Sequence, residues 1–158
     1  MGKYRASPSY NVLRNRIAEK LKETVKALKE LGYKSLQLSP KEFYDYLTGE
    51  TPTGDTTTIV DVLGNDFLLI HEVVEMSELK KKGIPINENT VMMFLPEVYE
   101  AHYTATEYEL NFVLSKKDFD WLRVRIDHAK SWLEDSSMPQ HLAPRCKAII
   151  KKFSKLLP

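Results

Sequence analysis

The sequence predicts an all-α fold, a single-domain bundle of about six helices with short loops and short extended connections. Apolar residues recur at three- and four-residue spacings over long stretches of the chain. Residues typical of helix starts precede these stretches, and a glycine follows several of them. Strand-like patterns are scarce, and only residues 36–38 and 83–86 would form short extended pieces.

The first two helices are predicted from their apolar stripes and their boundaries. A helix over about residues 10–31 places one apolar stripe along its length, and Gly32 follows its end. A second, short helix begins after Ser39, which stands before a proline as an N-cap. Gly49 ends this helix, and a turn-like loop follows over residues 50–56.

The two central helices each contain a residue that should interrupt them. The third helix is predicted from residue 55 or 56 to about residue 82, with a weak point at Gly64 where it would bend. The fourth is predicted from residue 89 or 90 to about residue 114. Pro96 must kink or restart this helix, because proline lacks a backbone donor and clashes with the preceding turn.

The last two helices are predicted from a serine and a proline. Ser115 would cap a fifth helix over about residues 116–134. Residues 135–143 are rich in serine and proline and should form a loop. Pro144 would then start a last helix that ends near Leu157, with an apolar arc that docks on the core.

Length and composition are those of a folded, non-membrane protein. The 158 residues, 42% of them hydrophobic and 28% charged, suit one domain over residues 1–158. The only cysteine, Cys146, cannot form an intramolecular disulfide, and no leader-like apolar stretch opens the chain. We therefore expect a cytoplasmic protein. The longest apolar runs are far shorter than the roughly 20 residues of a membrane span.

The net charge of +1 hides a segregation along the chain. Residues 1–36 hold nine Lys and Arg against three acids, and residues 111–158 hold ten against five. Between them, residues 41–110 hold four against fourteen, so the central helices over 55–114 are acidic and the terminal helices are basic. This pattern suits a cation-binding centre for an anionic substrate, and it equally suits solvated faces that attract one another.

The third predicted helix contains the run His71-Glu72-Val73-Val74-Glu75. His71 and Glu75 are i and i+4 neighbours, a spacing that lets two side chains bind one metal ion. The run lacks the second histidine of the H-E-x-x-H zinc helix. On a helical wheel, however, these polar residues lie opposite the apolar arc, so an ordinary solvent-facing surface is the simpler interpretation.

The fourth predicted helix gives the opposite result. Its solvent arc is already filled by polar residues, and His102 and Glu109 fall in the middle of its apolar arc. We therefore expect both side chains to point inward. A buried carboxylate is costly unless it is protonated, pairs with a cation or binds a metal ion, so Glu109 requires a partner.

A partner for Glu109 is available on the fifth predicted helix. Arg125 lies inside its apolar arc, beside Trp121 and Trp132, and His128 lies at the edge. A guanidinium held between two indoles can offer paired donors to a carboxylate or a phosphate. Arg125 would bind either Glu109 or a substrate, and pairing with Glu109 would explain the inward acid structurally.

These residues support the hypothesis of a metal-dependent hydrolase for a small anionic substrate, such as a phosphorylated one. His71, Glu75, His102 and Glu109 would be the ligands, and their nitrogen and oxygen atoms suit zinc, manganese or iron. Glu72 would act as general base through bound water, and Arg125 or His128 would bind the anion. Because His102 and Glu109 lie seven residues apart, about 10 Å along a helix, one ion would bind both only if the helix kinks or a water bridges the gap. Otherwise one of them would support the other ligands rather than bind directly.

Two other hypotheses remain open. The chain would alternatively be a non-catalytic helical interaction module, such as a homodimer, whose inward polar groups pair with one another. Nucleic-acid binding through the basic ends ranks last, because the pI of 7.8 is well below that of typical binders and the acidic middle would repel a polyanion.

Overall fold

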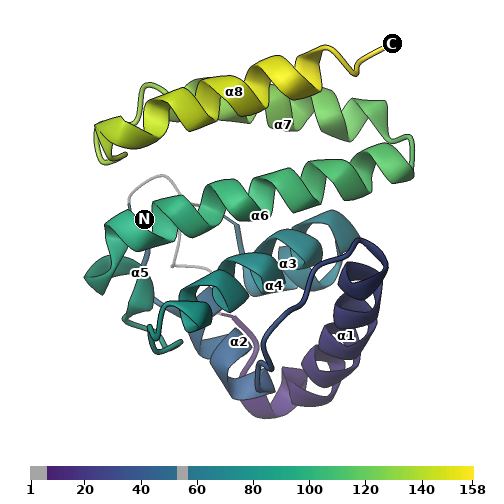
Figure 1. The fold of residues 1–158 in the computed structure, drawn as a ribbon. Coiled ribbons are helices and arrows are strands. Elements are labelled where there is room, and N and C mark those ends of the chain that lie inside the picture. Colours follow the sequence, from purple (N-terminus) through teal and green to yellow (C-terminus); the bar gives the residue numbers. More distant parts are fainter. Residues whose placement is uncertain (1–6, 53–56) are drawn as a thin grey trace.

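A computed structural model describes residues 7–52 and 57–158, and all regular structure in these ranges is helical (Figure 1). The helices are α1 (Tyr10–Glu30), α2 (Pro40–Thr48), α3 (Ile59–Leu63), α4 (Asp66–Lys81), α5 (Thr90–Met93), α6 (Leu95–Ser115), α7 (Phe119–Trp132), the 3-10 helix η2 (Gln140–Leu142) and α8 (Ala143–Ser154). Within the described ranges, six of them have seven residues or more. The prediction of an all-α fold with about six helices is confirmed.

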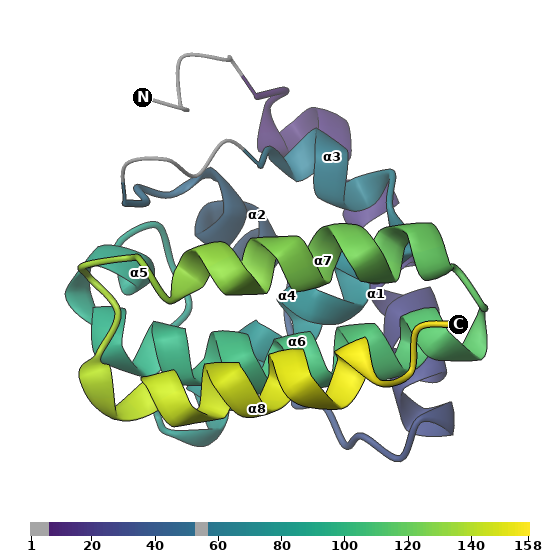
Figure 2. The same cartoon turned by 90° about the horizontal axis from the view of Figure 1, so that it is seen from above.

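The helices pack on both sides of α6. Helices α7 and α8 lie side by side over one side of α6, as Figure 2 shows from above. Helix α4 packs along the other side of α6 and makes the broadest helix contact of the described chain. Helices α1, α2 and α3 lie beyond α4 (Figure 1). The third and fourth predicted helices thus pack against each other, as their short connection suggests.

Helix α4 packs against α1, α3 and α6, and this corrects one expectation from the helical wheel. Of its polar arc, Glu72 and Glu78 stay partly exposed, whereas His71 and Glu75 are covered by α6 and α2. His71 is only 3% exposed and Glu75 only 7%, so the interpretation of these residues as an ordinary solvent-facing surface is wrong. A wheel assigns one inner face to a helix, and that assumption fails for a helix in the middle layer.

Both central predicted helices break at the expected residues. Gly64 ends α3, and the Asn65 side chain accepts hydrogen bonds from two backbone N–H groups to begin α4. The predicted start at residue 55 or 56 lies outside the described residues, and α3 itself begins at Ile59 behind a Thr58 capping box. Pro96 restarts the fourth predicted helix, because it lies in the first turn of α6.

The boundary between α6 and α7 differs from the predicted one. Ser115 is the last residue of α6 and does not cap α7. The cap is Asp118, whose side chain accepts a hydrogen bond from the backbone N–H of Trp121 at 3.0 Å. The chain turns between the two helices through Lys117, which has a positive φ of 56°. An aspartate is as good a cap as a serine, and the capping pattern alone does not choose between them.

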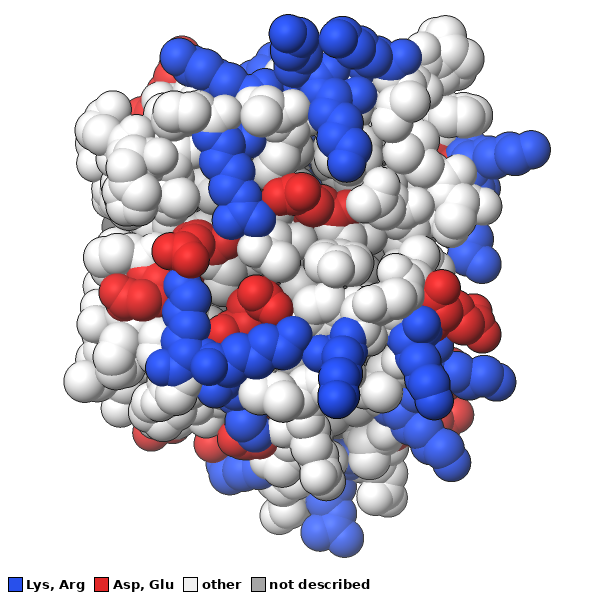
Figure 3. Space-filling view, viewed as in Figure 1, with Lys and Arg blue, Asp and Glu red and all other residues white. Residues whose placement is uncertain are grey.

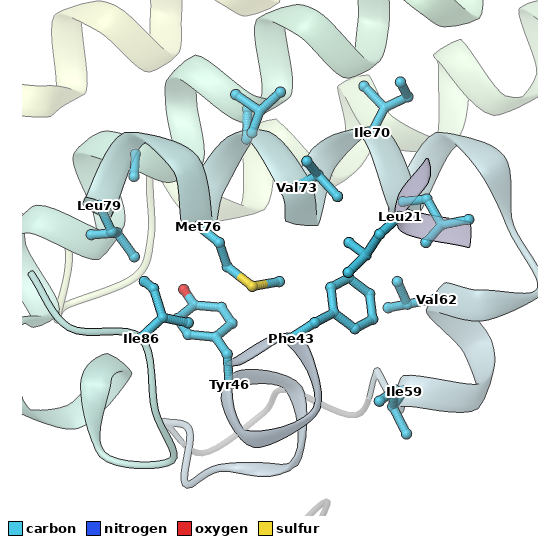
Figure 4. Close-up of a cluster of buried hydrophobic side chains, with 14 of the residues drawn as sticks. Leu21, Phe43, Tyr46, Ile59, Val62, Ile70, Val73, Met76, Leu79 and Ile86 are labelled. Atoms are coloured by element: carbon cyan, nitrogen blue, oxygen red, sulfur yellow. The ribbon is translucent and has the colours of Figure 1, made fainter. Parts of the chain in front are cut away.

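The apolar core consists of two clusters. The larger one contains residues from the four helices α1, α2, α3 and α4 and from the first half of α6. Figure 4 shows Phe43, Val73 and Met76 within it. The smaller one joins the middle of α6 to α7 and α8 and includes Tyr103 and Phe153. The buried polar side chains are Thr24, His71, Glu75, Ser77, Thr90, Thr106, Glu109 and Arg125. Four of them, His71, Glu75, Glu109 and Arg125, contact one another between α4, α6 and α7.

The charged surface follows the segregation along the chain. Figure 3 shows basic side chains gathered where α8 lies and acidic side chains below them. Arg145 at the start of α8 contacts Glu107 of α6 at 2.9 Å, so one basic end is attached to the acidic middle. None of the described helices is long and apolar enough to cross a bilayer.

One glycine in this fold is required by a close backbone approach. A Cβ atom at Gly49 would lie 2.4 Å from the carbonyl oxygen of Glu88. We predict that Gly49→Ala lowers the free energy of unfolding by about 1–3 kcal/mol in urea denaturation, because the two loops must move apart. Gly64→Ala is the control, since its Cβ would meet Val60 O at an ordinary 3.5 Å. Equal stabilities for the two variants would contradict the close approach.

Candidate metal centre

Two helices bring three potential ligand atoms together. Helix α4 presents His71 and Glu75 one turn apart, and their Nε2 and Oε2 atoms are 3.2 Å apart. Helix α6 presents His102, whose Nδ1 lies 3.1 Å from His71 Nε2 and 3.5 Å from Glu75 Oε2. These three residues form a group that could hold a metal ion.

The size of this triangle matches metal coordination. Zinc binds histidine nitrogen and carboxylate oxygen at about 2.0–2.1 Å, so two ligands of a tetrahedral ion lie about 3.3–3.4 Å apart. The three edges of 3.1, 3.2 and 3.5 Å are close to this spacing. Three protein ligands with one open position are typical of catalytic rather than structural zinc sites.

Glu75 is held in this position by a tyrosine that sequence reasoning missed. The hydroxyl of Tyr46, from α2, donates a 2.5 Å hydrogen bond to Glu75 Oε1 and leaves Oε2 directed at the histidines. Figure 4 shows the Tyr46 ring beside Met76 and Ile86 in the core, with its hydroxyl turned toward α4. A phenol on a buried helix face requires a partner, which is the signal that the sequence offered.

Glu109 lies on the far side of His71, outside the triangle. Its Oε1 accepts hydrogen bonds from His71 Nδ1 at 2.9 Å and from Arg125 Nη2 at 2.8 Å. Its Oε2 accepts from Arg125 Nε and from the Trp121 indole N–H, both at 2.8 Å. Glu109 is 0% exposed, so the expectation of an inward carboxylate is confirmed, and its cationic partner is Arg125.

Arg125 connects this buried network to the surface. Two of its nitrogens bind Glu109, and the third, Nη1, lies 3.2 Å from Nδ1 of His128, which is exposed. Its guanidinium carbon lies 6.0 Å from the Trp121 ring centre and 5.6 Å from that of Trp132. The predicted position of Arg125 between two indoles is confirmed.

His102 provides the route from the triangle to solvent. Its side chain is 24% exposed, whereas the other two members of the triangle are nearly closed off. The Trp132 indole meets its ring edge to face at 4.4 Å. Glu72 follows His71 in α4 and is half-buried, and its negative charge contributes to raising the pKa of His71. Neither Glu72 nor His128 belongs to the ligand group of the described residues.

The charges of the network are strongly coupled. Burial would lower the pKa of His71, but hydrogen bonds to Glu109 and Glu75 outweigh it and raise this pKa to about 10. Burial would raise the pKa of Glu109, but His71 and Arg125 lower it to about 2. Burial also lowers the pKa of His102. At neutral pH an imidazolium therefore lies between two carboxylates, and an ion must replace the proton on His71 Nε2.

Comparisons with protein families, curated proteins and solved structures found no match for this chain.

The coupled charges predict how stability depends on pH. The pKa of Glu109 is lower in the folded protein than its ordinary 4.5, so its contribution is present above that value and lost as the pH falls toward 2. The pKa of His71 is higher than its ordinary 6.5, so its contribution is complete below that value and lost as the pH rises through 10. We predict that the metal-free protein is most stable between these limits.

Urea denaturation across this pH range is the measurement, with the double variant Glu109→Leu, Arg125→Met as reference. The difference in unfolding free energy between wild type and variant should shrink as the pH falls below about 4.5, because only the wild type loses the contribution of ionised Glu109. The surface carboxylates titrate in both proteins, so their effect cancels in the difference. A difference that stays constant down to about pH 2 would contradict the assignment of Glu109 as a buried, ionised carboxylate.

Proposed function

We propose that this protein binds one divalent transition metal ion through His71, Glu75 and His102 and uses it to hydrolyse a small anionic substrate. The observation that carries the proposal is the triangle of ligand atoms, with edges of 3.1–3.5 Å and a partly exposed histidine at one corner. Two imidazole nitrogens and one carboxylate oxygen suit zinc, manganese or iron. The cytoplasmic location expected from the single cysteine remains part of this proposal.

The buried charges favour an anion at the open position of such an ion. With both histidines neutral, a divalent ion joins the negative charges of Glu75 and Glu109 and the positive charge of Arg125. One net positive charge then remains in a nearly closed interior. A hydroxide or an anionic substrate group at the ion would neutralise it, and burial strengthens this attraction.

The surrounding side chains suggest how hydrolysis would proceed. An ion held by His71, Glu75 and His102 would supply a water of lowered pKa, and Glu72, whose charge acts on His71, would take the proton of that water. The water oxygen would bond to the phosphorus or carbonyl carbon of the substrate as the bond to the leaving group breaks, and Glu72 would return the proton to the leaving group. Arg125 Nη1 and His128, at the surface end of the network, would hold an anionic group of the substrate.

A second candidate function is supported by the completeness of the network. Every buried side-chain nitrogen and oxygen of the described residues has a hydrogen-bond partner without any ion. The polar layer would then fix the packing of α4, α6 and α7 in an interaction module or homodimer. Metal binding separates the two candidates, because a purely structural network predicts none.

We predict that the protein purified without a chelator or histidine tag binds one zinc or cobalt ion. His102→Ala should weaken this binding by about 10- to 100-fold or more. Isothermal titration calorimetry and thermal unfolding with added metal are the measurements. His141→Ala is the control, because this histidine lies in η2 outside the ligand group. Absence of bound ion and of stabilisation by divalent metals would end the proposed function and leave the structural network.

We further predict that Glu72→Gln lowers the hydrolysis rate by about 10²–10⁴-fold and leaves the zinc affinity unchanged, since a general base binds the reacting water and not the ion. The zinc-loaded protein is assayed on 4-nitrophenyl phosphate, phosphodiester and carboxylic ester substrates. Glu78→Gln on the same helix, where Glu78 pairs with Tyr33 and Lys81, is the control. Full activity of Glu72→Gln would remove Glu72 from the mechanism.

A further inference from the structure

We propose that Glu109 and Arg125 are positioning residues, which fix the ring of His71 so that its Nε2 lone pair faces the metal ion. The proposal rests on the metal binding proposed above and concerns residues outside the ligand triangle. It assigns a task to α7, a helix that supplies no ligand atom to the triangle.

The carboxylate of Glu109 has no free acceptor position for a metal ion. A carboxylate offers about four lone-pair positions, and Glu109 uses four for His71, Trp121 and the two nitrogens of Arg125. Its side chain is completely buried, so no water competes for these positions. Direct binding to an ion would cost hydrogen bonds that a buried charge requires.

The two ring nitrogens of His71 face different partners. A neutral imidazole carries one proton, and the nitrogen that lacks it is the metal ligand. His71 Nδ1 faces the Glu109 carboxylate at 2.9 Å, which can only accept a hydrogen bond, so the proton belongs on Nδ1. The lone pair of Nε2 is then directed toward Glu75 and His102. Without Glu109, the tautomer with a proton on Nε2 would compete with metal binding.

Glu109 is itself held in place by two side chains of α7. Arg125 binds it through Nε and Nη2, and this paired contact fixes the carboxylate plane as a single contact would not. The indole of Trp121 adds a donor from the same helix. These contacts connect α7 to His71 of α4 through Glu109 of α6. The position of α7 therefore determines the orientation of the His71 ring.

The same helix α6 provides a matched control. Glu107 pairs with Arg145 at 2.9 Å and also joins α6 to the outer pair of helices. This pair is about one-third exposed and does not contact the ligand triangle. Removing it tests the general effect of a lost interhelical ion pair on the fold.

The experiment compares the double variant Glu109→Leu, Arg125→Met with the double variant Glu107→Leu, Arg145→Met. Both charges are removed together because a single charge left unpaired in the interior would destabilise the fold. Zinc affinity is measured by competition with a chelating dye, the cobalt absorption spectrum reports the coordination geometry, and urea denaturation reports the metal-free stability. Trp121→Phe is a milder third variant, since it removes one donor to Glu109 and keeps both charges.

We expect Glu109→Leu, Arg125→Met to weaken zinc binding by about 10- to 100-fold and to change the cobalt spectrum, as loss of a supporting contact does. Trp121→Phe should show a smaller loss, and the Glu107 and Arg145 variant should bind as wild type does. Wild-type affinity and spectrum in both Glu109→Leu, Arg125→Met and Trp121→Phe would overturn the positioning role while the proposed function stands. Failure of the wild-type protein to bind zinc or cobalt would overturn both.

Discussion

The interior of this protein is organised around one buried carboxylate. Glu109 is 0% exposed and ionised, and a charge in that environment is tolerated only if cationic and hydrogen-bonding partners surround it. Those partners come from two other helices, His71 from α4 and both Arg125 and Trp121 from α7. The carboxylate thereby links α4, α6 and α7, the three helices that meet at the site.

In the proposed metal-bound state, the interior exchanges a proton for a metal ion. In the metal-free protein the His71 imidazolium balances Glu75 and Glu109, and Arg125 provides the second positive charge. An ion at the triangle would replace the proton on Nε2 and would keep the contact between Nδ1 and Glu109. The same side chains therefore support a complete hydrogen-bond network and a coordination site.

The sequence predicted the helices well because caps, glycines and prolines act locally. It also placed Glu109 and Arg125 inward, since each interrupts the apolar arc of its helix, and the partly buried His102 lies on the same arc as Glu109. The same test failed for His71 and Glu75, because α4 is enclosed by neighbours on both arcs. Tyr46 could not be assigned to the site from spacing, since its contact to Glu75 joins helices 29 positions apart in the chain. The division of roles between Glu75 and Glu109 likewise depends on the register between helices.

We propose that His71, Glu75 and His102 coordinate one ion while Glu109 does not. Crystals of the zinc-loaded protein, with diffraction recorded on both sides of the zinc absorption edge, would locate that ion. We expect one anomalous peak about 2.0–2.1 Å from His71 Nε2, His102 Nδ1 and a Glu75 oxygen, with Glu109 still bound to Arg125. A peak coordinated by Glu109, or zinc found only at surface side chains, would contradict it.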